Sequence, residues 1–188
     1  MCFYITATLP EKTDIEPVRD ILNRYNMLFS PLDNNTFISQ LRSGELLFRA
    51  TKDYCDCNTS LGLLNQDKVY QELLNSKKVK TLRKKKWTQS QIDEWIKEKL
   101  QKKTPHTKRS ITENERQLDA ERWSNFIQEI LKKVKRIGVF KHWYSASIEN
   151  EELSIKRTER INLQKLNRNY LLNLEEDVLY EIFPQFYK

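Results

Sequence analysis

One long amphipathic segment limits the folds open to this chain more than any other feature. Between residues 112 and 137, apolar side chains recur every three or four positions, the spacing of one face of an α-helix. The stripe consists of Leu118, Trp123, Phe126, Ile127, Ile130, Leu131, Val134 and Ile137. Thr112 and Glu115 fit a capping box, and Gly138 is placed to end the helix. A helix with such a face must be covered by a second layer.

Strands that the sequence predicts could form that second layer. Residues 2–9 alternate and are rich in β-branched and aromatic side chains, so they predict a strand that Pro10 ends. After it we expect a helix over 14–25, a short strand over 27–31, a helical turn over 36–41 and a strand over 45–51. This order matches the start of a ferredoxin-like split βαβ arrangement, in which the first and third strands are antiparallel central neighbours.

The carboxy-terminal part predicts a hairpin followed by a docked tail. We expect strands over 139–145 and 153–163, paired with each other as a hairpin. The tail, 169–186, is rich in leucine and predicts a short helical stretch that packs on the body. The three acidic residues at 175–177 are typical of a helix start, where the helix dipole favours negative charge.

The basic character of the chain is confined to one insert-like region. The formal net charge is +7, but the 13 basic and three acidic residues from Lys77 to Arg109 give that stretch +10, which leaves −3 elsewhere. We therefore expect a single α+β domain over residues 1–188, with a basic helical insert at 75–111. The domain would combine an antiparallel sheet with the long core helix.

Helical signals occur within the insert. A helix is expected to begin over 67–74, and Thr88 and Gln91 fit a capping box for another. The second helix has an apolar stripe of Ile92, Trp95, Ile96 and Leu100. Residues 102–110, which include a proline, are typical of a linker.

The lysines of the insert would attract polyanions. The candidate contact residues are Lys84, Lys85, Lys86, Trp87, Lys97 and Lys99. The lysines could bind phosphates of a nucleic acid while a tryptophan stacks on a base. An acidic protein would be attracted by the same charge, and a solvated face explains the lysines equally well. No helix-turn-helix glycine, RNA-recognition motif or zinc-finger spacing accompanies them.

Several classes of protein and site are disfavoured. No apolar run approaches the ~20 residues of a membrane span, and the first residues lack the basic region of a secretory signal. Three cysteines, an odd number, disfavour a secreted disulfide framework, so we expect a cytoplasmic protein without a membrane partner. The chain contains no Walker loop, no Gly-x-Gly-x-x-Gly and no His-Glu-x-x-His.

The segment from Arg49 to Gly62 is the strongest candidate for a functional site, because it holds Cys55 and Cys57. In the strand arrangement given above, the start of the first strand lies beside the end of the third. That arrangement brings Cys2, the remaining cysteine, toward residues 54–57.

Three interpretations of these cysteines stay open. Cys2, Cys55 and Cys57 could hold zinc with a histidine, since thiolates are good zinc ligands, although Cys-x-Cys is tighter than the usual spacing. Cys2 could instead be a thiol nucleophile that one of the other two resolves. The three side chains could also pack as small hydrophobic groups without any chemistry. Asp56 and Thr59 would line such a site.

Two histidines, His106 and His142, are available as a base or a metal ligand. His106 lies in the expected linker, whereas His142 lies on an expected strand, so His142 is the stronger candidate. Phe140 and Tyr144 flank it on the same strand face. This environment is more typical of a hydrogen-bonded, partly buried histidine than of a catalyst.

The pattern Met-Cys, Thr-Ala-Thr-Leu-Pro and Cys-Asp-Cys-Asn-Thr-Ser-Leu-Gly resembles a small group of uncharacterised bacterial proteins. The resemblance covers mainly residues 1–62, with a weaker similarity over 170–182. It implies no activity, but it implies that the Cys-Asp-Cys stretch belongs to the body of the fold.

Met1-Cys2 also resembles the start of class II glutamine amidotransferases, whose first-residue cysteine becomes the nucleophile once methionine is removed. Leu47-Phe-Arg-Ala-Thr51 is similar to the arginine segment of that family. The chain departs from the family in having no Asn-Gly and no glycine after the cysteine.

These observations lead to two hypotheses. The first is a cysteine-centred site, a thiol or zinc centre, in which Cys2 and His142 would be catalytic if the protein is an enzyme. The second is a non-enzymatic binding module that uses residues 77–109 on nucleic acid or on an acidic protein.

Overall fold

The computed structural model describes residues 2–50, 55–62, 70–71, 73–103 and 111–184. The chain forms two compact units. The first, the sheet unit, comprises residues 1–63 and 109–188, and the second, the helical unit, comprises residues 64–108. No helix within the described ranges is both long and apolar enough to cross a membrane.

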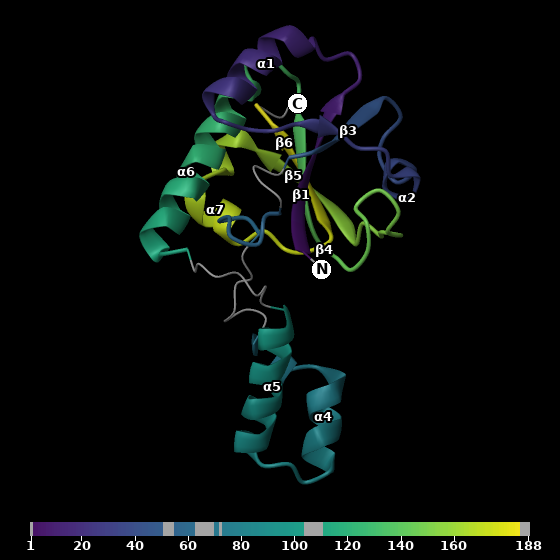
Figure 1. Cartoon of the computed structure of the whole chain (residues 1–188), viewed down its shortest axis with the longest axis vertical. Coiled ribbons are helices and arrows are strands. Elements are labelled where there is room, and N and C mark those ends of the chain that lie inside the picture. Colours follow the sequence, from purple (N-terminus) through teal and green to yellow (C-terminus); the bar gives the residue numbers. More distant parts are fainter. Residues whose placement is uncertain (1, 51–54, 63–69, 72, 104–110, 185–188) are drawn as a thin grey trace. The chain divides into compact units, whose positions relative to one another are not determined.

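A six-stranded sheet is the centre of the sheet unit (Figure 1). Its strands are β1 (Cys2–Pro10), β2 (Ser30–Pro31), β3 (Glu45–Arg49), β4 (Ile137–Tyr144), β5 (Arg157–Asn162) and β6 (Val178–Phe183). Their order is β2-β3-β1-β4-β6-β5, and every neighbouring pair is antiparallel except β5 and β6. The predicted α+β class is therefore confirmed. β1 is paired antiparallel with β3, as the ferredoxin-like arrangement requires.

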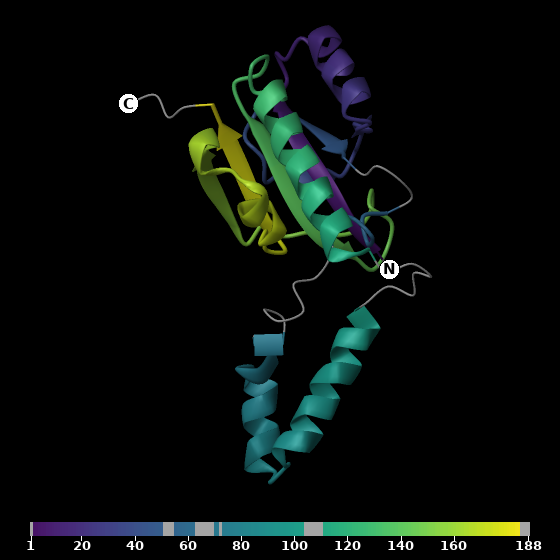
Figure 2. The ribbon, with the colours of Figure 1, turned by 90° about the vertical axis from the view of Figure 1, so that its left-hand side faces the viewer.

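Three of the helices lie on one face of this sheet. The helices of the sheet unit are α1 (Ile15–Arg24), α2 (Asn35–Ile38), α6 (Glu113–Ile130) and α7 (Arg168–Leu172). Figure 2 shows α1, α6 and α7 in front of the strands. In Figure 1, α2 and the segment 145–156 lie on the opposite side of the sheet from α6. That second face is only partly covered, so it is where a surface cavity can form.

Capping residues determine where the helices α1 and α6 begin. The side chain of Asp14 accepts a hydrogen bond from the amide of Glu16 at the start of α1. At the start of α6, Thr112 and Glu115 form the predicted capping box in both directions. Each cap satisfies backbone N–H groups that the first helical turn leaves without partners.

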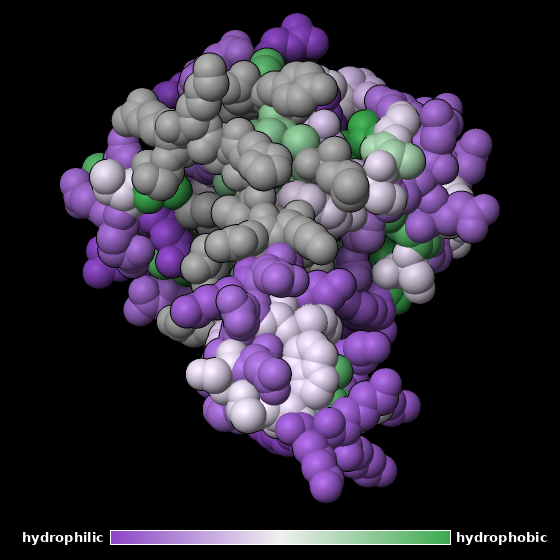
Figure 3. Space-filling model, turned by 60° about the horizontal axis from the view of Figure 1, so that its bottom comes forward, coloured by the Kyte–Doolittle hydropathy of each residue, from purple (hydrophilic) through white to green (hydrophobic). Residues whose placement is uncertain are grey.

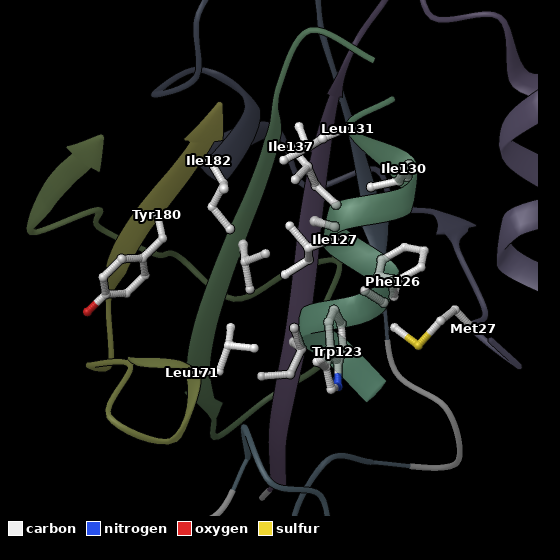
Figure 4. Close-up of a cluster of buried hydrophobic side chains, with 14 of the residues drawn as sticks. Met27, Trp123, Phe126, Ile127, Ile130, Leu131, Ile137, Leu171, Tyr180 and Ile182 are labelled. Carbon is white, nitrogen blue, oxygen red and sulfur yellow. The ribbon is translucent and has the colours of Figure 1, made fainter. Parts of the chain in front are cut away.

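The main core fills the space between α6 and the sheet (Figure 4). Trp123, Phe126 and Ile127 on α6 are almost fully buried against alternate residues of β1, including Ile5 and Ala7. This is the stripe that the sequence predicts, packed on the inward face of a strand with period two, except that Leu118 is exposed and does not belong to it. A smaller apolar cluster on the other face includes Leu32, Phe37, Leu47, Phe140, Tyr144, Ile148, Leu153 and Leu179.

The prediction that the core helix runs to Ile137 and ends at Gly138 is wrong. The helix α6 ends at Ile130, and β4 already begins at Ile137. Leu131 and Val134 continue the apolar stripe because they lie in buried turns after the helix. Gly138 instead lies in β4, where a side-chain Cβ would meet the Thr8 hydroxyl at 2.2 Å.

The predicted carboxy-terminal hairpin is wrong, and the predicted docked helical stretch in the tail is confirmed only for α7, whose Leu171 and Leu172 are buried. The strand β5 does not pair with β4, because β6 lies between them. The tail contributes α7 and then β6, so the acidic residues 175–177 precede a strand and not a helix. The run Val178-Leu-Tyr-Glu-Ile-Phe183 is rich in β-branched and aromatic residues, which is a strand signal.

The helical unit is built around an apolar seam between α4 (Lys77–Lys84) and α5 (Gln89–Lys103). Its buried residues are Val79, Leu82, Ile92 and Ile96. Residues 70–71 and 73–74 are helical, but 67–69 and 72 of that predicted helix lie outside the described residues. Of the predicted linker, 102–103 end α5 and 104–110 lie outside the described residues. The extent of the insert, 75–111, stays a prediction.

The buried face of α6 should dominate the stability of the sheet unit. Ile127 is fully buried, whereas Leu118 on the same helix is 58% exposed. We expect Ile127→Ala to lower the free energy of unfolding by about 2–5 kcal/mol, because it leaves a cavity. Leu118→Ala, the matched control, should change it by less than about 0.5 kcal/mol. Urea denaturation measures both, and equal effects would contradict this packing.

Candidate functional site

The segment 55–57 completes the edge of β1 where β3 has ended. Up to residue 50, where the described part of that strand region ends, the final strand-like contact is the amide of Ala50, which donates to the carbonyl of Ile5 at 2.8 Å. Beyond it, the amide of Asp56 donates to the carbonyl of Phe3 at 2.9 Å. The amide of Ile5 donates to Oδ2 of Asp56 at 2.8 Å. The backbone and the side chain of Asp56 thus make hydrogen bonds to β1 that a neighbouring strand would otherwise make.

Asp56 is buried, with 1% of its surface exposed, and the residues after it fold around it. The Thr59 amide and hydroxyl donate to the carbonyl of Asp56 at 2.9 and 3.0 Å. A Cβ on Gly62 would lie 1.8 Å from that same carbonyl oxygen, so only glycine fits there. These contacts give Asp56, Thr59 and Gly62 structural roles, although Asp56 and Thr59 were expected to line the site.

A second set of hydrogen bonds ties this segment to α6. The amide and hydroxyl of Ser60 donate to Oδ2 of Asp119 at 2.9 and 2.7 Å. Arg122 donates to the other carboxylate oxygen of Asp119 at 2.5 Å. The Cys-Asp-Cys stretch is therefore part of the body of the sheet unit.

This arrangement brings the three cysteines together. The sulfur atoms of Cys2, Cys55 and Cys57 all lie within 4.8 Å of one another. Cys57 is buried, Cys2 and Cys55 are partly exposed, and all three are free thiols. The amide of Phe3 donates to the Cys57 sulfur at 3.2 Å. The meeting of Cys2 with Cys55 and Cys57, expected from the strand order alone, is confirmed, and the three thiols could hold a metal ion.

Burial disfavours the charged form of these thiols. It raises the pKa of Cys57 to about 12, and the amide of Phe3 offsets only part of that effect. Burial is also the largest cause that raises the pKa of Cys2, followed by its hydrogen bond with Cys55. Both thiols are thus protonated at neutral pH in the metal-free protein. That state is the opposite of an activated thiolate nucleophile.

His142 lies outside the cysteine cluster and has other partners. Its Nδ1 is 2.5 Å from Oδ1 of Asp177, and its Nε2 is 3.6 Å from Glu151. Its ring lies in a T-shaped arrangement with the ring of Tyr144, with centroids 4.8 Å apart. The structure thus places His142 in a hydrogen-bonded, partly buried environment. The other histidine, His106, lies outside the described residues.

Asp177 is the hydrogen-bond partner of His142, and the sequence analysis did not identify it. Burial alone would raise its pKa, but hydrogen bonds with His142 and Lys156 outweigh that effect and hold the pKa below its usual range. Asp177 also has a positive φ of 63°, directly before β6. The strand pattern that follows it could have placed it beside β4 and hence near His142.

Four of the predicted contact residues of the helical unit, Lys84, Lys85, Lys86 and Trp87, lie around the turn between α4 and α5. Lys86 has a positive φ of 61°, and its amide and that of Trp87 bond back to Arg83 and Leu82. This is a Schellman-type helix end, which turns the chain sharply. The lysines at 84–86 are exposed, and Trp87 is 39% exposed.

The helix after the turn carries the remaining predicted contact residues. Lys97 and Lys99 on α5 are exposed, and the Lys99 ammonium lies 5.7 Å from the ring centroid of Trp95. Figure 3 shows hydrophilic side chains at the edges of the helical unit, around paler ones of intermediate hydropathy. The basic residues therefore form a solvent-accessible surface.

Comparisons of the chain with protein-family models, with curated proteins and with solved structures found no match in any of the three. Met1 lies outside the described residues, so an amidotransferase-like nucleophile at Cys2 stays a prediction. The function must therefore be argued from the sites themselves.

Asp56 should be essential for the shape of the site. We expect Asp56→Ala to lower the free energy of unfolding by about 1–3 kcal/mol or more, because the buried amide of Ile5 loses its acceptor. Asp20→Ala, at an exposed position of α1, is the control and should have an effect below about 0.5 kcal/mol. Chemical denaturation compares the two, and an Asp56→Ala protein as stable as the control would rule out this anchoring role.

Proposed function

We propose that the protein binds a zinc ion through the thiolates of Cys2, Cys55 and Cys57. The observation that carries the proposal is the position of the three sulfur atoms, all within 4.8 Å of one another. The sequence separates Cys2 widely from the other two, so the fold itself assembles the cluster.

The spacing of the sulfur atoms suits this ion. Zinc–sulfur bonds of about 2.3 Å in a tetrahedron place the sulfurs about 3.8 Å apart, so a contraction of about 1 Å is enough. Cys2 and Cys55 are partly exposed, so they are not enclosed on all sides. Cys57 is held by the amide of Phe3, and a donor of this kind orients a metal-bound thiolate.

Three protein ligands leave one position of a tetrahedral zinc ion open. Among the described residues, the cluster contains the three cysteines and no further histidine or carboxylate. An open fourth position is the arrangement of zinc sites that bind water or an external ligand, whereas closed structural sites use four protein ligands. Within the described residues, the proposed site therefore supplies three ligands and leaves the fourth position to water or an exogenous molecule.

Removal of one thiolate should abolish tight zinc binding. We expect the purified chain to contain one zinc ion and Cys55→Ser to bind zinc more than about 100-fold more weakly, since even second-shell changes cost 10–100-fold. Elemental analysis and titration with a chromophoric zinc chelator measure the stoichiometry and the affinity. His142→Ala is the control, because His142 lies outside the cluster.

Two results would contradict the proposal. One is an unchanged affinity in Cys55→Ser with circular dichroism equal to that of the wild type. The other is a wild-type chain that shows one alkylatable thiol without reductant and three with it. That second result would mean that two of the cysteines form a disulfide, as the thiol-redox interpretation requires.

We also propose that the helical unit binds single-stranded nucleic acid. The specific observation is the exposure of Trp87 next to Lys84, Lys85 and Lys86. An exposed aromatic ring beside several cations can stack on a base while the lysines contact phosphates. The exposure of Trp87 supports this function, since part of its ring is accessible to a base.

Salt dependence tests this second function. The probe is oligo(dT). Replacing Lys84, Lys85 and Lys86 with glutamine should make the slope of log affinity against log salt less steep by about 2, because three phosphate contacts are lost. Trp87→Ala should weaken binding by about 1–3 kcal/mol. The matched control replaces Lys132, Lys133 and Lys135, three exposed lysines of the sheet unit. If both triple variants lose the same affinity for oligo(dT), the turn between α4 and α5 has no specific role in binding.

A further inference from the structure

The three cysteines of the proposed zinc site differ in how far solvent reaches them. Cys57 is 1% exposed, whereas Cys2 and Cys55 are partly exposed. Oxidation of a cysteine depends on the access of the oxidant to its sulfur as well as on its thiolate character. An oxidant in solution therefore reaches Cys2 and Cys55 before it reaches Cys57.

Cys57 is also held in place by its neighbours. The amide of Phe3 donates to its sulfur at 3.2 Å. Asp56, which separates Cys57 from Cys55, is anchored to β1 through both its amide and its carboxylate. A bond between Cys55 and Cys57 would have to close around this anchored residue, which disfavours that pair.

Cys2 and Cys55 form the other accessible pair. Cys2 begins β1, and Cys55 begins the segment 55–57 that lies beside it. Their thiols are hydrogen-bonded to each other, and their sulfur atoms lie within 4.8 Å. A disulfide needs a separation of about 2.05 Å, so the two sulfurs must approach by no more than about 2.8 Å. Cys2 and Cys55 are thus both accessible to an oxidant and already in contact.

The proposed zinc ion bears on the chemistry of this pair. Zinc binds cysteine as the thiolate. The thiolate, and not the thiol, is the form that a hydroperoxide oxidises. The same sulfur atoms therefore hold the ion and react with the oxidant, so that oxidation and metal binding exclude each other.

We propose that the zinc site is regulated by oxidation: a hydroperoxide joins Cys2 to Cys55 in a disulfide, and the zinc ion is released. This inference rests on the zinc site proposed above. Only Cys57 then remains as a ligand, and a single thiolate does not hold zinc tightly. A dithiol that reduces the disulfide restores the site.

The reaction consumes one peroxide for each disulfide. One of the two thiolates attacks a peroxide oxygen, the O–O bond breaks, and that cysteine becomes a sulfenic acid while the leaving hydroxide takes a proton to form water. The second thiolate attacks the sulfenic sulfur, the S–S bond forms, and the S–O bond breaks to release a second hydroxide, which also becomes water. The two sulfurs together lose two electrons, which the peroxide accepts, and solvent supplies two protons.

The test adds hydrogen peroxide to the full-length, zinc-loaded protein. A chromophoric zinc chelator should report one zinc ion released for each disulfide formed. Alkylation after denaturation, followed by mass spectrometry, should find three reactive thiols before treatment and only Cys57 after it. Dithiothreitol and added zinc should then restore the metal content. A sample kept without peroxide is the control and should keep its zinc.

Two matched cysteine variants test the assigned pair. Cys57→Ser retains both partners, so it should still form the disulfide between Cys2 and Cys55 when peroxide is added. Cys55→Ser removes one partner and should form no disulfide within the chain. This comparison reads the disulfide directly and does not depend on the metal content of either variant.

Several results would overturn the inference. One is a zinc-loaded chain that keeps its zinc and its three reactive thiols in peroxide. Others are a disulfide that includes Cys57 in the wild type, and zinc release through sulfinic acid without a disulfide, which dithiothreitol does not reverse. These results contradict the regulation alone. A chain without zinc before peroxide is added contradicts the proposed function and this inference with it.

Discussion

The structure depends on the hydrogen bonds that the backbone of β1 makes along both of its edges. Along one edge, β4 pairs with β1 from Cys2 to Thr8. Along the other, β3 covers only the second half, and Asp56 with its neighbours completes the first half. A central strand cannot leave buried amides unpaired, so the segment 55–57 must lie against the start of β1. The meeting of the three sulfur atoms is a direct result of that requirement.

Much of this could be inferred from the sequence because it rests on local signals. Period-two alternation identified β1, and apolar spacing with a capping box identified α6. The neighbourhood of Cys2 and Cys55 followed from one topological assumption, that the first and third strands are antiparallel neighbours. Once the register is fixed, the distance between residues far apart in the chain follows with it.

The remaining features depend on partners that no local pattern specifies. Leu131 and Val134 keep helical spacing although the helix has ended, because turns can also face the core. The strand β6 inserts between β4 and β5, and this exchange of neighbours hid both the pairing of His142 with Asp177 and the cavity around Glu181. Gly138 has no side chain where three strands meet, and its sequence context gives no sign of this.

The hydrogen bonds between Ser60 and Asp119 have a consequence for how such a protein can change over evolutionary time. They join positions 59 residues apart, one before and one after the helical unit. Two positions that flank the helical unit in the sequence are therefore held together within the sheet unit. Lengthening the intervening chain costs little, about 0.6 kcal/mol for each doubling of a flexible loop. A gene can therefore exchange the module at this junction while the sheet, its thiol cluster and its cavity are inherited unchanged.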